Sequence, residues 1–127
     1  MYLFLYYFSG IFICIPIFEW FMHYLLHIIY NDNHKLHHLA FHNNKVRIER
    51  WPIYTLIIFL YLNWHIMIIL NLKYYIFHTI IHKYPNICNG LFKCYANHHL
   101  IHHKHPEYNY GVSSIWVDKL FKTYYIN

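Results

Sequence analysis

Apolar residues occur along the chain in two long runs that a polar segment separates. Residues 1–18 are apolar almost without interruption, and Pro16 is the strongest helix breaker among them. As a helix, this run would be roughly 27 Å long, close to the hydrocarbon thickness of a bilayer, and extension to residue 30 gives ample length. We therefore predict an uncleaved membrane anchor over residues 1–30, with Pro16 as the candidate position of a kink.

The second apolar run extends from Trp51 to about Phe77, and histidines precede and follow it. A single membrane crossing would place those histidines on opposite faces, so a site that they share requires the run to turn back. Two arms of about 12 residues would each reach only ~18 Å, which is too short to span a bilayer. We predict a shallow helical hairpin over residues 51–77, with its bend near Leu62–His65.

Composition supports a membrane protein of one domain. The chain has 127 residues, of which 58% are hydrophobic and 12% charged, and a soluble domain of this size needs more polar surface. All ten Lys and Arg residues lie between Lys35 and Lys122, which predicts that the segments carrying them face the cytoplasm. These residues are scattered among apolar runs, which argues against nucleic-acid binding. Three cysteines without a C-x-x-C pair predict neither a disulfide framework nor a thiolate zinc site.

These patterns predict an all-α integral membrane protein with a cytosol-facing, histidine-rich cap, and the spacing of its histidines predicts that this is a di-metal cap. A single domain covers residues 1–127. Within it, residues 1–30 form the anchor and carry the first histidine motif, residues 51–77 form the membrane hairpin, and residues 78–127 form the cap with the later motifs. Trp20, Trp51 and Trp64 are expected as anchors at the membrane interface.

Histidine is the residue type that points to chemistry. Ten of the 14 histidines form four motifs in the order HxxxH, HxxHH, HxxxH, HxxHH. Positions i, i+3 and i+4 share a helix face, so we expect each motif to direct its imidazoles to a common point. Ten imidazole nitrogens exceed the needs of one ion, and two ions with about five nitrogens each are the simplest division. The predicted ligands are His23, His27, His34, His37, His38, His78, His82, His99, His102 and His103. The other four histidines, His42, His65, His98 and His105, lie outside the pattern, although His98 could replace His99.

Other metal chemistries fit the sequence less well. A carboxylate-bridged di-iron bundle needs several Glu residues with Glu-x-x-His pairs, and a zinc peptidase needs HExxH, and neither motif occurs. The histidine pattern also allows two hypotheses that involve no catalysed reaction. One is a non-catalytic membrane metal-binding protein, and the other is a bis-histidine haem protein, which would leave eight of the clustered histidines unexplained.

Five segments resemble the fatty acid hydroxylase superfamily, which includes sterol desaturases and sphingolipid fatty acid hydroxylases. They comprise Glu19–His23 at the first histidine motif, Phe77–His82 at the third, Asn97–His103 at the fourth, and Asn109–Ser114 and Asp118–Tyr124 near the end of the chain. The last two are informative because histidine richness alone cannot produce them. Lys122 stands where this superfamily usually has glycine.

The resemblance implies a membrane-bound di-iron oxygenase that hydroxylates or desaturates a fatty acyl, sphingolipid or sterol lipid with O2. Two Fe ions are the implied cofactors, although Zn can take their place after purification. A separate electron donor is implied, such as cytochrome b5 with its reductase, because the chain contains no G-x-G-x-x-G fingerprint. Glu19 and Asp118 are the candidates for hydrogen bonding to ligand rings. The implied location is an endoplasmic reticulum-like membrane, and the alternative is a catalytically inactive metal-binding protein of the same ancestry.

Overall fold

The computed structural model describes residues 2–29, 32–42, 64–84 and 90–126, and these are mostly helical. The elements are α1 (Tyr2–Ser9), the π-helix η1 (Gly10–Cys14), α2 (Ile15–Ile28), α3 (Asp32–His42), α5 (Trp64–Lys83), α6 (Leu91–Lys104) and α7 (Trp116–Leu120). No strand occurs within the described ranges. The prediction of an all-α protein is confirmed.

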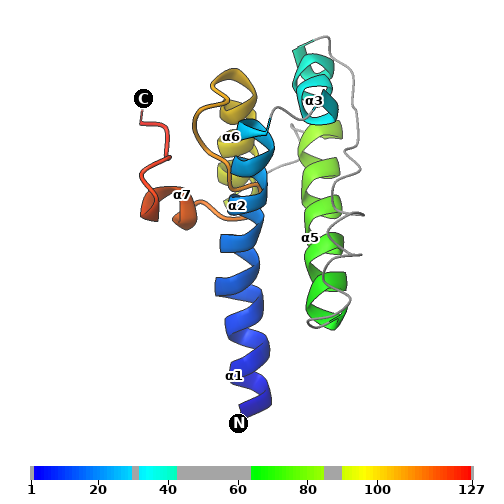
Figure 1. The fold of residues 1–127 in the computed structure, drawn as a ribbon, viewed down its shortest axis with the longest axis vertical. Helices are drawn as coiled ribbons and strands as arrows, with labels where there is room; N and C mark the ends of the chain where they lie inside the picture. Colours follow the sequence, from blue (N-terminus) through cyan, green and yellow to red (C-terminus); the bar gives the residue numbers. More distant parts are fainter. Residues whose placement is uncertain (1, 30–31, 43–63, 85–89, 127) are drawn as a thin grey trace.

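The first three elements form one long helical rod (Figure 1). This rod, Tyr2–Ile28, has 27 residues and is the one helix of the described part that is long and apolar enough to cross a membrane. Its irregularity lies just before Pro16, where the N–H group of Ile15 donates to the carbonyl of Gly10 across a π-helical turn. Proline lacks an N–H group and its ring collides with the carbonyl four residues earlier. A wider turn at this point lets the helix continue through Pro16.

Helix α5 contains the described part of the second apolar run. It has 20 residues, which correspond to about 30 Å, and it continues through the third histidine motif to Lys83. The first arm of the predicted hairpin, residues 51–63, lies outside the described residues, as does most of the predicted bend. The described arm is longer than the 12 residues we expected because neither Gly nor Pro interrupts the sequence between Trp64 and Lys83.

The architecture repeats once along the chain. The rod ends in an HxxxH motif and is followed by α3 with an HxxHH motif, and α5 ends in HxxxH and is followed by α6 with HxxHH. Figure 1 shows the C-terminal ends of α2 and α5 at the same end of the molecule, where α3 and α6 also lie. Helix α1 extends away from that end and has no buried residue. Its large exposed apolar side chains are Tyr2, Leu3, Phe4, Leu5, Tyr6 and Phe8.

Two small cores join the helices to the tail, which we define as residues 105–126 and which contains α7. One core combines Tyr74 and Ile81 of α5 with Ala96 of α6 and Val112 of the tail. The second core combines residues of α2 and the tail, namely Trp20, Tyr110 and Val117.

The interfacial role predicted for Trp20 is wrong, because this side chain is buried in the second core and only 8% exposed. Its indole N–H donates to Asp118 Oδ1 at 3.0 Å, so its polar atom is satisfied without water. Trp64 is exposed at the start of α5, and Trp51 lies outside the described residues.

Lys122 adopts a left-handed backbone conformation, with φ of 59°. This conformation explains why glycine is usual at this position, since a Cβ there costs about 1–2 kcal/mol. We expect Lys122→Gly to raise the free energy of unfolding by up to about 1 kcal/mol, because the greater entropy of unfolded glycine offsets part of the gain. Thermal unfolding in detergent measures the change. As a control, Lys93→Gly in helix α6 should instead lower stability by about 1 kcal/mol. A loss of stability in Lys122→Gly would contradict the argument that the backbone of Lys122 is strained.

Candidate metal centre

All ten predicted ligands gather in two groups of five at one end of the molecule. Within each group, the available ring nitrogens lie within 4.8 Å of one another. We name the groups site 1 and site 2. Site 1 contains His23 and His27 of α2, His34 and His38 of α3, and His102 of α6. Site 2 contains His78 and His82 of α5, His99 and His103 of α6, and His37 of α3. The division into five and five agrees with the arrangement expected from the sequence, while metal binding itself stays a prediction.

Each HxxHH motif is divided between the two sites. In α3, His34 and His38 belong to site 1, whereas His37 belongs to site 2. Adjacent helix residues point about 100° apart, while residues i and i+4 share a face, so a helix that lies between two sites can serve both. The same division in α6 assigns His99 and His103 to site 2 and His102 to site 1. The expectation of one common point per motif therefore holds for the HxxxH motifs and is wrong for the HxxHH motifs.

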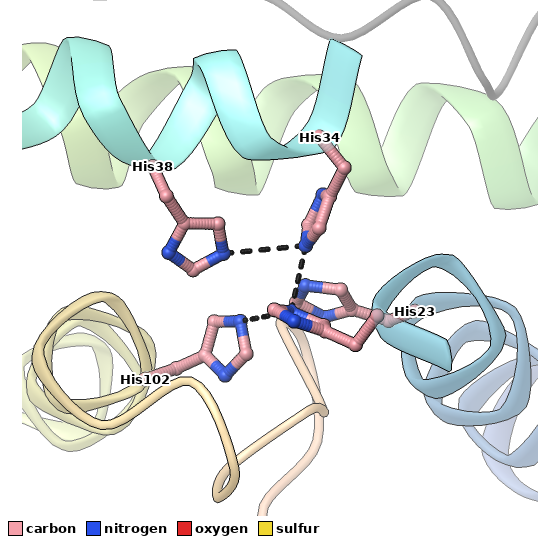
Figure 2. A group of neighbouring side chains, drawn as sticks. His23, His34, His38 and His102 are labelled. Carbon is pink, nitrogen blue, oxygen red and sulfur yellow. Dashed lines mark hydrogen bonds between the residues drawn. The ribbon is translucent and has the colours of Figure 1, made fainter. Parts of the chain in front are cut away.

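The nitrogens of site 1 have spacings that suit a metal ion. His27 Nε2 lies 2.7 Å from His34 Nε2 and 3.1 Å from His102 Nε2. His38 Nε2 lies 3.2 Å from His34 Nε2. For metal–imidazole bonds of about 2.1 Å, two ligands at right angles are about 3.0 Å apart. Figure 2 shows the rings of His23, His34, His38 and His102 pointing from three helices toward the same space.

Site 2 has the same spacing and adjoins site 1. His37 Nε2 lies 3.2 Å from both His78 Nε2 and His103 Nε2, and His82 Nε2 lies 3.1 Å from both His99 Nε2 and His103 Nε2. The ring centroids of His38 in site 1 and His103 in site 2 are 4.5 Å apart. Ions in these two sites would therefore be neighbours, as a dinuclear centre requires.

The donor set has the protonation state that a metal ion needs. Burial, and secondarily the neighbouring imidazoles, lowers the pKa of His99, His102 and His103 of α6 below the usual value of 6.5. These rings are neutral at pH 7, and a neutral imidazole has one nitrogen with a free lone pair. Five lone pairs that converge in a buried space repel one another, and a bound cation relieves that repulsion. The residues present therefore fit a metal ion at each site.

The metal-free protein should lose stability below about pH 6.5. The α6 histidines have lowered pKa values when folded, so the unfolded chain takes up their protons first as the pH falls. Their contribution is fully present above about pH 6.5 and is lost progressively below it. Thermal unfolding of chelator-treated protein between about pH 8 and pH 5 measures this effect. Replacement of these three histidines with glutamine should flatten the profile, and a stability that does not change with pH in the unaltered chain would contradict the argument.

No hydrogen bond joins Glu19 to a ligand ring in the described part of the chain. Its carboxylate is fully buried and accepts hydrogen bonds from the backbone N–H groups of Val112 and Ser113, both at 2.7 Å, and from the Ser113 hydroxyl at 2.6 Å. The sequence placed Glu19 one turn before His23, on the correct face of α2. The tail occupies that face and supplies the donors instead, so Glu19 fastens the tail to α2.

Asp118 also binds the tail and a histidine outside the two sites. It is fully buried and accepts five hydrogen bonds, from His98 Nε2, the backbone N–H groups of Tyr110 and Gly111, Trp20 Nε1 and Thr123 Oγ1. The geometry favours His99 over His98 as a ligand, because His98 pairs with Asp118 at 2.8 Å whereas His99 belongs to site 2. The expected contact of Asp118 with a predicted ligand is replaced by this pair.

Two backbone carbonyls perform the role that sequence reasoning gave to the carboxylates. His23 Nδ1 donates to the carbonyl of Tyr110 at 2.5 Å, and His102 Nδ1 donates to the carbonyl of Tyr108 at 2.6 Å. Since a carbonyl only accepts, each ring carries its proton on Nδ1 and presents Nε2 to site 1. Tyr110 lies in the Asn109–Ser114 segment that carried the family resemblance, but no side-chain pattern in the sequence identifies a backbone carbonyl as the partner of a ligand ring.

Two further histidines, His65 and His105, are not members of either site. His65 is exposed at the start of α5, and His105 stacks on Tyr125 with ring centroids 4.6 Å apart. Both lie outside the four motifs of the sequence. The side chain of His42 is outside the described part.

Comparison with known families gives one match. A family model described as fatty acid hydroxylase matches residues 8–123, which include all ten histidines of sites 1 and 2 and both buried carboxylates. No curated protein and no solved structure matches the chain.

Proposed function

Because the chain belongs to the fatty acid hydroxylase family, we propose that it is a membrane-bound di-iron oxygenase that hydroxylates or desaturates a lipid with O2. The observation that carries this proposal is the pair of adjoining five-histidine groups in a chain of this family. A chain that had lost its function would be free to lose these spacings, which join four helices across the molecule.

The five histidines of each site would together hold one iron ion. When bound, such an iron pair supplies the activation of O2 that attack on an unactivated C–H bond requires. The protein's own contribution is to hold the rings in place, to keep them neutral and to exclude water. Seven of the ten ligand histidines are buried, among them His99, His102 and His103, which are at most 1% exposed.

The proposed substrate is a fatty acyl, sphingolipid or sterol lipid within the bilayer. The rod presents exposed apolar side chains along α1 and η1, such as Phe4, Phe8 and Phe12, and the histidine sites begin at its other end. A lipid chain lying beside such a rod could approach the metal sites without entering water. The position of the basic residues supports an orientation with the sites toward the cytoplasm. For the membrane itself we propose one like the endoplasmic reticulum, on the basis of the family.

Electrons would come from a separate donor, for which we propose cytochrome b5 with its reductase. The described part of the chain offers imidazole groups for metal ions and no glycine-rich turn for a dinucleotide. The proposal includes no nucleic-acid partner.

The test is lipid oxidation by the full chain in vesicles that contain fatty acyl, sphingolipid and sterol lipids. We expect iron-loaded protein, given reduced donor and isotopically labelled O2, to yield a lipid that has gained labelled oxygen or lost two hydrogens, as mass spectrometry detects. The control is His38→Ala with His103→Ala, which removes one ligand from each site. Full metal loading without any lipid product would replace this proposal with a non-catalytic metal-binding protein.

A further inference from the structure

We propose that the tail prearranges site 1, so that site 1 binds its metal ion more tightly than site 2, with Asp118 as the positioning residue. This inference rests on the proposed two-metal function. The observations that carry it are the hydrogen bonds on the outer nitrogens of the ligand rings, which differ between the two sites.

Two rings of site 1 are fixed from outside. His23 and His102 donate through Nδ1 to the carbonyls of Tyr110 and Tyr108, at 2.5 Å and 2.6 Å. Each bond sets the tautomer and the ring orientation before a metal arrives. A ring that is already oriented loses less freedom when it binds an ion, so the site gains affinity.

Two buried carboxylates hold the tail segment that supplies these carbonyls. Asp118 accepts the N–H groups of Tyr110 at 2.8 Å and Gly111 at 2.9 Å, and Glu19 accepts those of Val112 and Ser113 at 2.7 Å. Four consecutive N–H groups are thus bound. Tyr110 connects Asp118 to site 1 directly, since its N–H group donates to Asp118 while its carbonyl accepts from His23.

Two of the five ligands of site 2, both on α6, lack such a hydrogen bond within the described residues. The Nδ1 atoms of His99 and His103 are buried and have no hydrogen-bond partner in the part of the chain that the structure describes. When Nε2 binds a metal, Nδ1 must carry the proton, and a buried N–H group without an acceptor disfavours that state. Nothing among the described residues fixes the orientation of these two rings through Nδ1.

Affinities of the isolated sites test the proposal. His78→Ala with His82→Ala disables site 2, and His23→Ala with His27→Ala disables site 1, both in the full chain in detergent. Competition with a chelator gives the dissociation constant for Co2+ at the remaining site. We expect site 1 to bind about tenfold more tightly or better, since partners of ligand rings typically change metal affinity 10–100-fold. Equal affinities, or a tighter site 2, would overturn the inference.

Asp118→Asn tests the positioning role. We expect it to weaken Co2+ binding at site 1 about tenfold or more and to leave site 2 within about threefold, because the carbonyls that Asp118 helps to hold in place accept from His23 and His102, which both belong to site 1. Glu107→Gln is the matched control, since it removes the same charge from an exposed position beside Tyr108. Equal weakening of both sites would indicate general loss of structure and overturn the role.

A milder variant covers the case in which Asp118→Asn does not fold. Thr123→Val removes one hydroxyl that donates to Asp118 Oδ1 at 2.7 Å, and we expect a smaller loss at site 1 alone. These readouts are independent of lipid turnover. Tighter Co2+ binding at site 1 without lipid oxidation would overturn only the proposed function. Equal affinities with lipid oxidation would overturn only this inference. Absence of Co2+ binding at both sites would overturn both.

Discussion

His38→Ala should lower the metal affinity of site 1 about a hundredfold or more in a chain whose site 2 is disabled by His78→Ala and His82→Ala. In the same chain, His37→Ala should leave the metal affinity of site 1 unchanged. His37 and His38 are neighbours in the sequence, yet His38 is a member of site 1 and His37 is a member of site 2. Removal of His37 takes a ligand from a site that is already disabled. Removal of His38 takes one of the five nitrogens that hold the remaining ion.

Metal content after dialysis against a chelator measures this difference, and lipid oxidation in the otherwise unaltered chain complements it. Either single substitution should abolish oxidation if both ions are needed. The two variants differ only in which of two adjacent histidines is lost, so general instability should affect them alike. Equal loss of metal in both variants would show that the HxxHH motif of α3 serves a single ion, contrary to the structure.

Gly111→Ala should be the most damaging single substitution in the tail, with a loss of about 3 kcal/mol or more in the free energy of unfolding. A Cβ at this position would lie 2.1 Å from the carbonyl oxygen of Ser114 and 2.8 Å from Asp118 Oδ2. The first of these atoms belongs to the backbone. The second belongs to a carboxylate that accepts five hydrogen bonds, two of them at Oδ2, so neither atom can move aside cheaply. The carbonyl that orients His23 belongs to Tyr110, the residue before Gly111. Because a displaced Tyr110 would no longer orient this ring, we expect the metal affinity of site 1 to fall as well.

Thermal unfolding and Co2+ affinity of the Gly111→Ala chain measure these effects. Ser114→Ala provides the control within the same segment, because its buried hydroxyl has no hydrogen-bond partner in the described part of the chain. Its removal should change stability by less than about 1 kcal/mol, since no hydrogen bond is lost. Wild-type stability in Gly111→Ala would mean that the tail does not approach Asp118 as closely as the structure shows.

The sequence by itself determined the features that depend on local spacing. An apolar run predicts a helix long enough for a membrane, and the rod Tyr2–Ile28 confirms that such a helix exists. The histidine motifs, with the Asn109–Ser114 and Asp118–Tyr124 segments, identified the family, which the family match confirms. Helix periodicity also predicted that His23 and His27 lie on one face, as do His78 and His82, because positions i and i+4 always do.

Local spacing could not predict hydrogen-bond partners that are distant in the sequence. Glu19 and Asp118 were predicted to hydrogen-bond to ligand rings, but their partners in the fold are other groups, up to 94 and 98 residues away in the sequence. A buried carboxylate binds whichever donors the fold brings to it, and here the tail brings backbone N–H groups and His98. The burial of Trp20 has the same cause, because α7 and the tail cover a helix face that the sequence pattern assigns to the membrane interface.

The division of ligands between the two sites was decided by tertiary structure alone. Sequence spacing places His34, His37 and His38 on one helix, and likewise His99, His102 and His103, but it cannot show that each helix lies between two sites. In the fold, α3 and α6 each serve both sites, so each site receives one histidine from the other half of the repeat. Spacing fixes the direction of a side chain from its own helix axis, and only the packing of four helices decides which directions meet.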